Sequence, residues 1–293
     1  MIIKHLLDKE SVVGIIGPGG IGKTMYTLEI SIRLLSGKQI PKWPKVNKFP
    51  KKVKFFTNDP EYESIRRIKG ISKALGVGAP AKLILERPVD LTPSSDDKGR
   101  YSNSDFLSLE IYEVSDESKE IDLFVFDTLK HFHAVDENSN TLMGLVMKQI
   151  MLFARSTGKP VIITHHVTGA SYFDSRAGSR GATVIPDEMH SILDIKESDL
   201  SNADLALFWT KAKFRRNKPK SFHAIRKNYL VKPTDSLPDY LKKLDGVQTG
   251  NKIIALIMKN SKVGKSKACE IRNDLLKAGA IRKIRKNQYE IVR

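Results

Sequence analysis

The sequence predicts an α/β fold in which a central, mostly parallel sheet is followed by a small C-terminal domain. Short apolar runs alternate with amphipathic stretches from residue 12 to residue 210, and a glycine-rich turn separates the first run from the first such stretch. The charge is uneven: residues 1–210 hold 27 Lys and Arg against 27 Asp and Glu, whereas residues 211–293 hold 23 against 6. We therefore expect a main domain over 1–231, a linker over 232–247 and a basic domain over 248–293.

The glycine-rich turn fits the phosphate-binding pattern G-x-x-x-x-G-K-[ST] at every fixed position. It lies between a predicted strand at 12–16 and a predicted helix at 25–35, so backbone N–H groups and a helix dipole converge on one anion. Lys23 would reach the β- and γ-phosphates, and Thr24 would hold Mg²⁺. The alternative is a turn that binds nothing. We predict that ATP binds through Gly17, Pro18, Gly19, Gly20, Ile21, Gly22, Lys23, Thr24 and Met25.

The remaining elements follow from apolar periodicity. We expect strands at 53–56, 81–85, 123–127, 161–164, 191–195, 205–210 and 223–231. Helices are expected from residue 60 through residue 68 and over 105–114, and a further helix is expected to end at residue 157. Residues 93–104 are expected to form a mobile surface loop.

Two of these strands end in polar residues that suit nucleotide chemistry. Asp127 ends the run 123–126 and would complete the Mg²⁺ shell. The histidines His165 and His166 follow the run 161–164, at the edge where open α/β sheets bind ligands. The pair suits a polar sensor of the γ-phosphate or attacking water, although metal ligation or a structural role for one of them stays open.

The last residues predict a winged helix-turn-helix that binds DNA: helices at 251–259 and 266–278, then a hairpin over 280–292 that turns at Lys286–Asn287. A basic surplus confined to one region indicates a polyanionic partner, here nucleic acid rather than an anionic membrane surface. A winged helix that mediates only protein contacts is the alternative. The glycine-rich segment 169–181 is either a DNA-contacting loop or an ordinary connection. The candidate DNA-binding residues are Arg176, Arg180, Lys265, Lys267, Arg272, Lys277, Arg282, Lys283, Arg285 and Lys286.

In their order along the chain these motifs resemble RecA-type ATPases. More closely, residues 11–230 resemble the RepA-type hexameric replicative helicases of broad-host-range plasmids and their mobile-element relatives. The segments that carry the resemblance are GPGGIGKTM at 17–25, NDP at 58–60, FDTLKHFH at 126–133, THH at 164–166, SRGAT at 179–183 and TKAKF at 210–214.

The resemblance implies a ring of six subunits with ATP and Mg²⁺ at the subunit interfaces. Lys23, Thr24 and Asp127 would bind the phosphates and the metal, and His166 would link the γ-phosphate to DNA-contacting loops. Lys211 and Lys213 lie where the wider family has basic groups that reach into the neighbouring subunit's site.

Two positions depart from the family pattern. Asn58 stands where the family has a glutamate that activates water, and an amide cannot take a proton; Asp59 or Glu61 could substitute. His190 stands where the family has an arginine that acts on the adjacent subunit's nucleotide, and Lys211, Lys213 or Arg215 could compensate.

Two hypotheses of function follow. The chain is either an ATP-driven DNA helicase or translocase, or a nucleotide-switched DNA-binding initiator, loader or regulator with little hydrolysis. A small-molecule kinase is a weaker third, since no acceptor site is evident. One cysteine excludes an internal disulfide, no apolar run is long enough to cross a membrane and no signal peptide opens the chain, so we expect a cytoplasmic protein.

Overall fold

The fold is described from a computed structural model of the 293-residue chain. The structure describes residues 1–95, 101–102, 119–166, 183–198, 203–212, 221–234, 241, 244, 247–277 and 280–291. The chain groups into two compact units. One comprises Met1–Ile195, Trp209–Lys218 and Asn228–Leu230; the other comprises Lys196–Phe208, Pro219–Lys227 and Val231–Arg293. The expected division at residues 231 and 248 remains a prediction.

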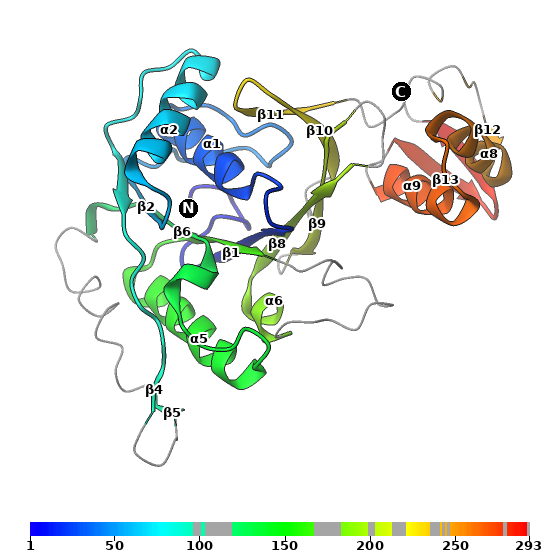
Figure 1. The fold of residues 1–293 in the computed structure, drawn as a ribbon. Helices are drawn as coiled ribbons and strands as arrows, with labels where there is room; N and C mark the ends of the chain where they lie inside the picture. Colours follow the sequence, from blue (N-terminus) through cyan, green and yellow to red (C-terminus); the bar gives the residue numbers. More distant parts are fainter. Residues whose placement is uncertain are drawn as a thin grey trace. The chain divides into compact units, whose positions relative to one another are not determined.

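A nine-stranded sheet runs through the described residues in the order β11-β10-β9-β8-β1-β7-β6-β2-β3 (Figure 1). β1 pairs in parallel with β7 and β8, β6 with β2 and β7, and β2 with β3, whereas β9 and β10 are antiparallel. The predicted α/β class with a mostly parallel sheet is confirmed. The strands are β1 (Val12–Gly17), β2 (Val53–Thr57), β3 (Leu83–Glu86), β6 (Leu123–Asp127), β7 (Val161–His166), β8 (Ser191–Glu197), β9 (Leu205–Ala212), β10 (Phe222–Lys227) and β11 (Leu230–Pro233).

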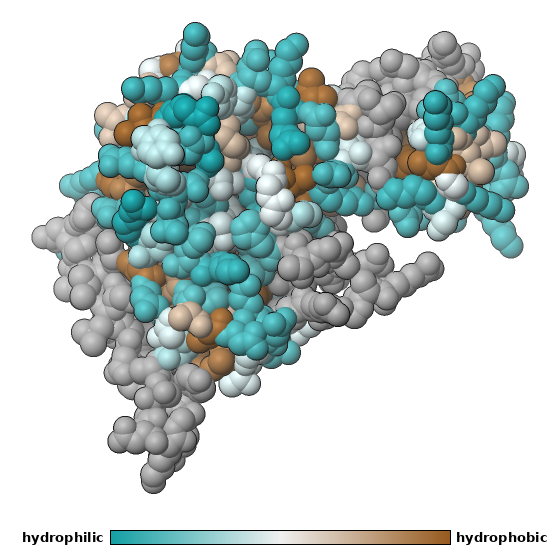
Figure 2. Space-filling model, in the orientation of Figure 1, coloured by the Kyte–Doolittle hydropathy of each residue, from teal (hydrophilic) through white to brown (hydrophobic). Residues whose placement is uncertain are grey.

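Helices cover both faces of the parallel strands. α1 (Lys23–Leu35) and α2 (Glu61–Leu75) lie on one face, and α5 (Asn140–Thr157) and α6 (Val184–Glu188) on the other, with the short 3₁₀ helix η1 (Leu129–Phe132) after β6 (Figure 1). The surface over α1 and α2 is mostly hydrophilic in Figure 2, because their apolar sides face the sheet.

Aromatic side chains fill the core beneath α5. Phe124 of β6 meets Phe153 of α5 edge to face with ring centroids 4.8 Å apart. Phe126 stacks on Phe132 of η1 at 4.9 Å. These rings are fully buried, so the strand that ends in Asp127 is fixed from the α5 side by aromatic packing.

Two sequence expectations are corrected. The single strand expected over 223–231 is the pair β10 and β11, because Asn228 and Tyr229 adopt φ values of 52° and 66° and reverse the chain. Part of the loop expected over 93–104 forms a small antiparallel pair, β4 (Ser94–Ser95) and β5 (Tyr101–Ser102), whose backbone hydrogen bonds hold the chain against itself. The helix expected over 105–114 lies outside the described residues.

The C-terminal part contains two helices and a three-stranded sheet: β12 (Val247–Thr249), α8 (Gly250–Ser261), α9 (Lys265–Lys277), β13 (Ile281–Arg285) and β14 (Gln288–Ile291). The sheet order is β12-β14-β13, and Asn287 at φ 60° makes the expected hairpin turn. Ile253, Ile257 and Leu275 pack with Tyr289 in one buried cluster. Among the described helices, none is both long and apolar enough to cross a membrane.

Candidate functional site

Four adjacent strands bring the predicted site residues to one edge of the sheet. β1, β7, β6 and β2 run parallel, so their carboxyl ends coincide. The pairing sets Gly17 opposite His166 and Thr57 opposite Asp127. The glycine-rich turn, the histidine pair and the acidic strand end therefore meet at the edge where open α/β sheets bind ligands.

The glycine-rich turn leads directly into α1. Gly22 precedes the helix at φ 93° and ψ 24°, a left-handed conformation that favours glycine, and no side chain caps the helix. The first N–H groups of α1 therefore stay available to an anion. At Gly17 an added Cβ would lie 2.2 Å from the carbonyl oxygen of Ile195, so only glycine fits against β8. All nine predicted ATP-binding residues, 17–25, lie in this turn and the first turn of α1.

Lys23 folds back onto the turn. Its Nζ donates to the carbonyl oxygens of Gly17 and Pro18, each at 2.8 Å, and lies 3.0 Å from Nδ1 of His166. A charged ammonium group only donates, so Nδ1 is the acceptor and the His166 proton is on Nε2. The Lys23 side chain is buried, and this burial lowers its pKa to about 8, partly opposed by the nearby negative charge of Asp127.

Asp127 is buried at the end of β6 and accepts a hydrogen bond from the Thr164 hydroxyl. A second side-chain hydrogen bond joins it to Thr24. Burial raises the pKa of Asp127, and these two bonds oppose the rise. The Asp127 carboxylate and the Thr24 hydroxyl, next to the phosphate-binding turn, could supply two ligands of Mg²⁺, and we call this pair the Mg²⁺ half-shell. The charge of Mg²⁺ would offset the cost of burying the carboxylate.

The histidines of β7 are neutral at pH 7 for a common reason. Burial lowers the pKa of His165 to about 3, and lowers the pKa of His166, where the positive charge of Lys23 adds to the effect. Successive residues of a strand point to opposite faces, so only His166 meets the phosphate turn. Within the described part of the chain, no group of three or more His, Cys, Asp or Glu side chains is arranged to hold a metal ion.

The segment after β2 contains Asn58, the position at which the resembling helicases have a glutamate. Asn58 is exposed, and its carbonyl oxygen accepts from Nη1 of Arg87 at 3.3 Å. Asp59 donates its backbone N–H to the Thr57 hydroxyl at 3.1 Å, and its carboxylate accepts from Arg67 of α2. The negative charge of Asp59 adds to burial in raising the pKa of Asp127.

Comparison with known proteins agrees with this geometry. The family model described as an AAA domain matches residues 1–171. The chain belongs to this AAA domain family. The crystal structure of the RadB recombinase has a similar fold, with a TM-score of 0.51 and 16% sequence identity over 78% of this chain and 92% of that one. The family consists of P-loop ATPases, whose reaction is nucleotide hydrolysis with Mg²⁺. In this AAA domain, Lys23 is suited to bind the phosphates, and Thr24 and Asp127 are suited to bind Mg²⁺.

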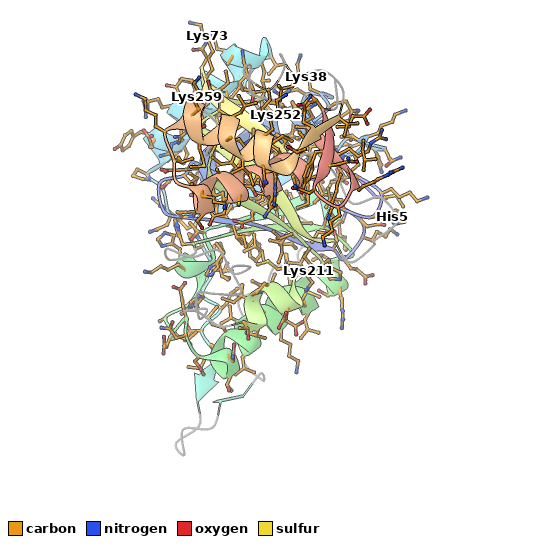
Figure 3. All side chains as sticks on the ribbon, turned by 90° about the vertical axis from the view of Figure 1, so that its right-hand side faces the viewer. His5, Lys38, Lys73, Lys211, Lys252 and Lys259 are labelled. Atoms are coloured by element: carbon orange, nitrogen blue, oxygen red, sulfur yellow. The ribbon has the colours of Figure 1, made fainter. Side chains whose placement is uncertain are left out.

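Two of the predicted inter-subunit residues, His190 and Lys211, contact their own chain. Nδ1 of His190 accepts from the backbone N–H of Val12 at 3.1 Å. Nζ of Lys211, labelled in Figure 3, donates to the carbonyl oxygens of Pro186 and Asp187 at 2.7 and 2.6 Å. Lys213, Arg215, Arg176 and Arg180 lie outside the described residues.

The C-terminal basic residues divide by their contacts. Arg272 of α9 is half-buried over the ring of Tyr289, with its Cζ 5.4 Å from the ring centroid. Arg282 pairs with Glu290 across the hairpin, and Lys267 pairs with Glu270 at 3.2 Å. The side chains of Lys265, Lys283, Arg285 and Lys286 are exposed, and that of Lys277 is not described.

Three site residues escaped sequence reasoning. Thr164 donates a hydrogen bond to the Asp127 carboxylate, and its place directly after the apolar run 161–163 could have indicated a role at the strand end. Arg67 and Arg87 hold the segment after β2, and neither has a sequence signal because arginines on surface helices and loops are common.

Proposed function

We propose that this AAA domain protein is an ATP-dependent DNA-binding motor, a ring-forming replicative helicase or translocase of the RepA type from a plasmid, phage or mobile element. The observation that carries the proposal is the contact between Lys23 and His166. It joins the group that would hold the phosphates to β7, which precedes the glycine-rich segment 169–181 in the sequence. A phosphate that displaces His166 from Lys23 would thereby act on the strand that comes before this candidate DNA-contacting segment.

ATP would bind through the turn 17–25, with its γ-phosphate replacing the carbonyl oxygens of Gly17 and Pro18 as partners of Lys23. Mg²⁺ would be held by Thr24 and Asp127, with Thr164 orienting the carboxylate. His166 would sense the γ-phosphate. In a hexamer the basic side chains of Lys211, Lys213 and Arg215, and His190, would act on the neighbouring subunit's nucleotide.

DNA would bind at two places. The order of α8, α9 and the β13–β14 hairpin supports a winged helix over 248–293, in which α9 and the hairpin would carry the basic groups. The exposed Lys265, Lys283, Arg285 and Lys286 are the groups best placed to contact phosphates. Lys252 and Lys259 of α8 add to the charge of this domain (Figure 3). Arg176 and Arg180 of the glycine-rich segment would contact single-stranded DNA in the ring channel.

Deleting residues 248–293 tests the proposed DNA site of the C-terminal domain. A protein that neutralises several phosphates loses affinity steeply as salt rises. We expect the deletion to weaken duplex binding and to reduce the slope of log affinity against log salt. An unchanged affinity and slope would assign the C-terminal domain to protein contacts instead.

The alternative is a nucleotide-switched DNA-binding initiator, loader or regulator. Asn58 supplies no base, and His190 and Lys211 are engaged within their own chain, which favours weak turnover. A DNA-stimulated ATPase assay on the wild type, Lys23→Ala and Asn58→Glu separates the two. We expect turnover in the wild type that Lys23→Ala abolishes. If the wild type is inactive and Asn58→Glu gains activity, the motor is rejected in favour of the switch.

A further inference from the structure

Asn58, at the position where the resembling helicases have a glutamate, offers no side chain that can act as a base. Asn58 is exposed, and Arg87 fixes its backbone by donating to the carbonyl oxygens of Asn58 and Asp59 at 3.3 and 3.4 Å. A carboxamide can orient a water molecule but cannot accept its proton. If the protein hydrolyses ATP with the help of a base, the base must therefore come from another residue.

Asp59 has the geometry that Asn58 lacks. It follows Thr57, the residue that pairs with Asp127 across β2 and β6, and its amide is fixed by the Thr57 hydroxyl at 3.1 Å. Its side chain is partly buried, with 35% exposed. It is close enough to Asp127 for its charge to act on that buried carboxylate. A carboxylate beside the Mg²⁺ half-shell, yet reached by water, suits a group that activates a water molecule.

Arg67 sets the orientation of this carboxylate. Its Nη1 donates to Oδ2 of Asp59, and its Nε donates to Oε1 of Glu63 at 2.9 Å. Glu63 lies one turn earlier on α2 and thus holds the guanidinium in place. Among the described residues, the side-chain contact of Asp59 is made through Oδ2, so Oδ1 can accept a proton from water.

We propose that Asp59 is the general base of ATP hydrolysis in this protein and that Arg67 is its positioning residue. Asp59 accepts a proton from the attacking water as its oxygen bonds to the γ-phosphorus. The bond from that phosphorus to the β–γ bridging oxygen breaks, ADP leaves with the electron pair, and the proton passes from Asp59 to solvent. The inference rests on the proposed ATP hydrolysis.

Steady-state ATPase kinetics of Asp59→Asn test the proposal, with Asp8→Asn as the same chemical change at a remote site. We expect kcat to fall by about 10²-fold or more with the affinity for a fluorescent ADP analogue kept within threefold, since general-base help is worth ~10²–10⁴-fold. Retained kcat, or loss of ADP-analogue affinity, would overturn the assignment. An inactive wild type would instead reject hydrolysis itself and the inference with it.

Arg67 is tested beside its neighbour Arg66, which pairs with Glu63 but not with Asp59. We expect Arg67→Ala to lower kcat about tenfold or more at unchanged KM, because Asp59 loses the side chain that orients its carboxylate. Arg67→Lys should restore part of the lost kcat. Equal effects of Arg66→Ala and Arg67→Ala on kcat, or a change in KM instead of kcat, would reject the positioning role.

Discussion

The buried amine of Lys23 makes the stability of the nucleotide-free protein depend on pH in a defined window. Burial lowers the pKa of Lys23 from 10.5 to about 8. Between these values the unfolded chain holds a proton that the folded protein has released, so stability rises with pH. The stabilisation is complete above the unfolded value and is lost as the pH falls through about 8.

The magnitude follows from the two values. The gain from pH 7 to pH 9 is about 1.3 kcal/mol, and the full gain to high pH is about 3 kcal/mol. Lys23→Met keeps a side chain of similar length and removes the titrating group, so ionisable groups that the Lys23 charge does not reach cancel in the difference between the two proteins. The lost bonds to Gly17 and Pro18 shift the whole curve of the variant but do not change its slope.

Urea unfolding at pH 7 and pH 9 measures this difference. We expect the free energy of unfolding of the wild type to gain about 1.3 kcal/mol relative to Lys23→Met. A saturating, non-hydrolysable ATP analogue with Mg²⁺ should remove the gain, because phosphates favour the charged amine. Parallel pH dependences of the two nucleotide-free proteins would refute the reasoning, since they would mean that the amine stays charged despite its burial.

Three further predictions concern single contacts. Gly17→Ala should destabilise the protein by about 2 kcal/mol or more in thermal unfolding, because its Cβ would collide with the Ile195 carbonyl, whereas Gly19→Ala, 3.8 Å from His166, should cost under about 1 kcal/mol. Thr164→Val should weaken Mg²⁺-dependent nucleotide binding by ~10-fold or more, since a hydrogen bond to a charged group is worth about 1.5–3 kcal/mol; calorimetric titration with unchanged affinity would contradict it. Tyr26→Phe should cost about 1–3 kcal/mol in urea unfolding because the buried Trp43 N–H, 2.9 Å from the Tyr26 hydroxyl, loses its acceptor.

Sequence reasoning succeeded where a local pattern dictates the structure. The strand, turn and helix around residues 12–35 follow from apolar periodicity and fixed glycines, and Asp127 follows from its place at the end of an apolar run. The strand order could not be read in this way, because β8 lies beside β1 although nearly 180 residues separate them in the chain. The turn at Asn228–Tyr229 was missed because a tyrosine at positive φ carries no turn signal.

The site residues found only in the structure are those that act through another side chain. Thr164 and Arg67 have ordinary positions in the sequence, and their roles depend on which carboxylate lies opposite. The sequence pattern drew attention to Asn58 because it occupies the glutamate position of the resembling family. The structure instead favours the next residue, Asp59, because Arg67 orients its carboxylate and it lies near the Mg²⁺ half-shell.

The phosphate-binding residue Lys23 and the proposed base Asp59 are therefore both held by hydrogen bonds in the nucleotide-free protein. Lys23 is held by two carbonyl oxygens and His166, and Asp59 is held by Arg67. ATP supplies the phosphates that replace the partners of Lys23, so binding alone can release the first restraint and with it His166. Nothing in the nucleotide replaces Arg67, which leaves the base oriented throughout the cycle. Turnover would then be limited by how the remaining charge on the transferring phosphate is neutralised. An arginine has this role in the resembling family. His190 does not fill the role from its present position, where it is bonded to Val12.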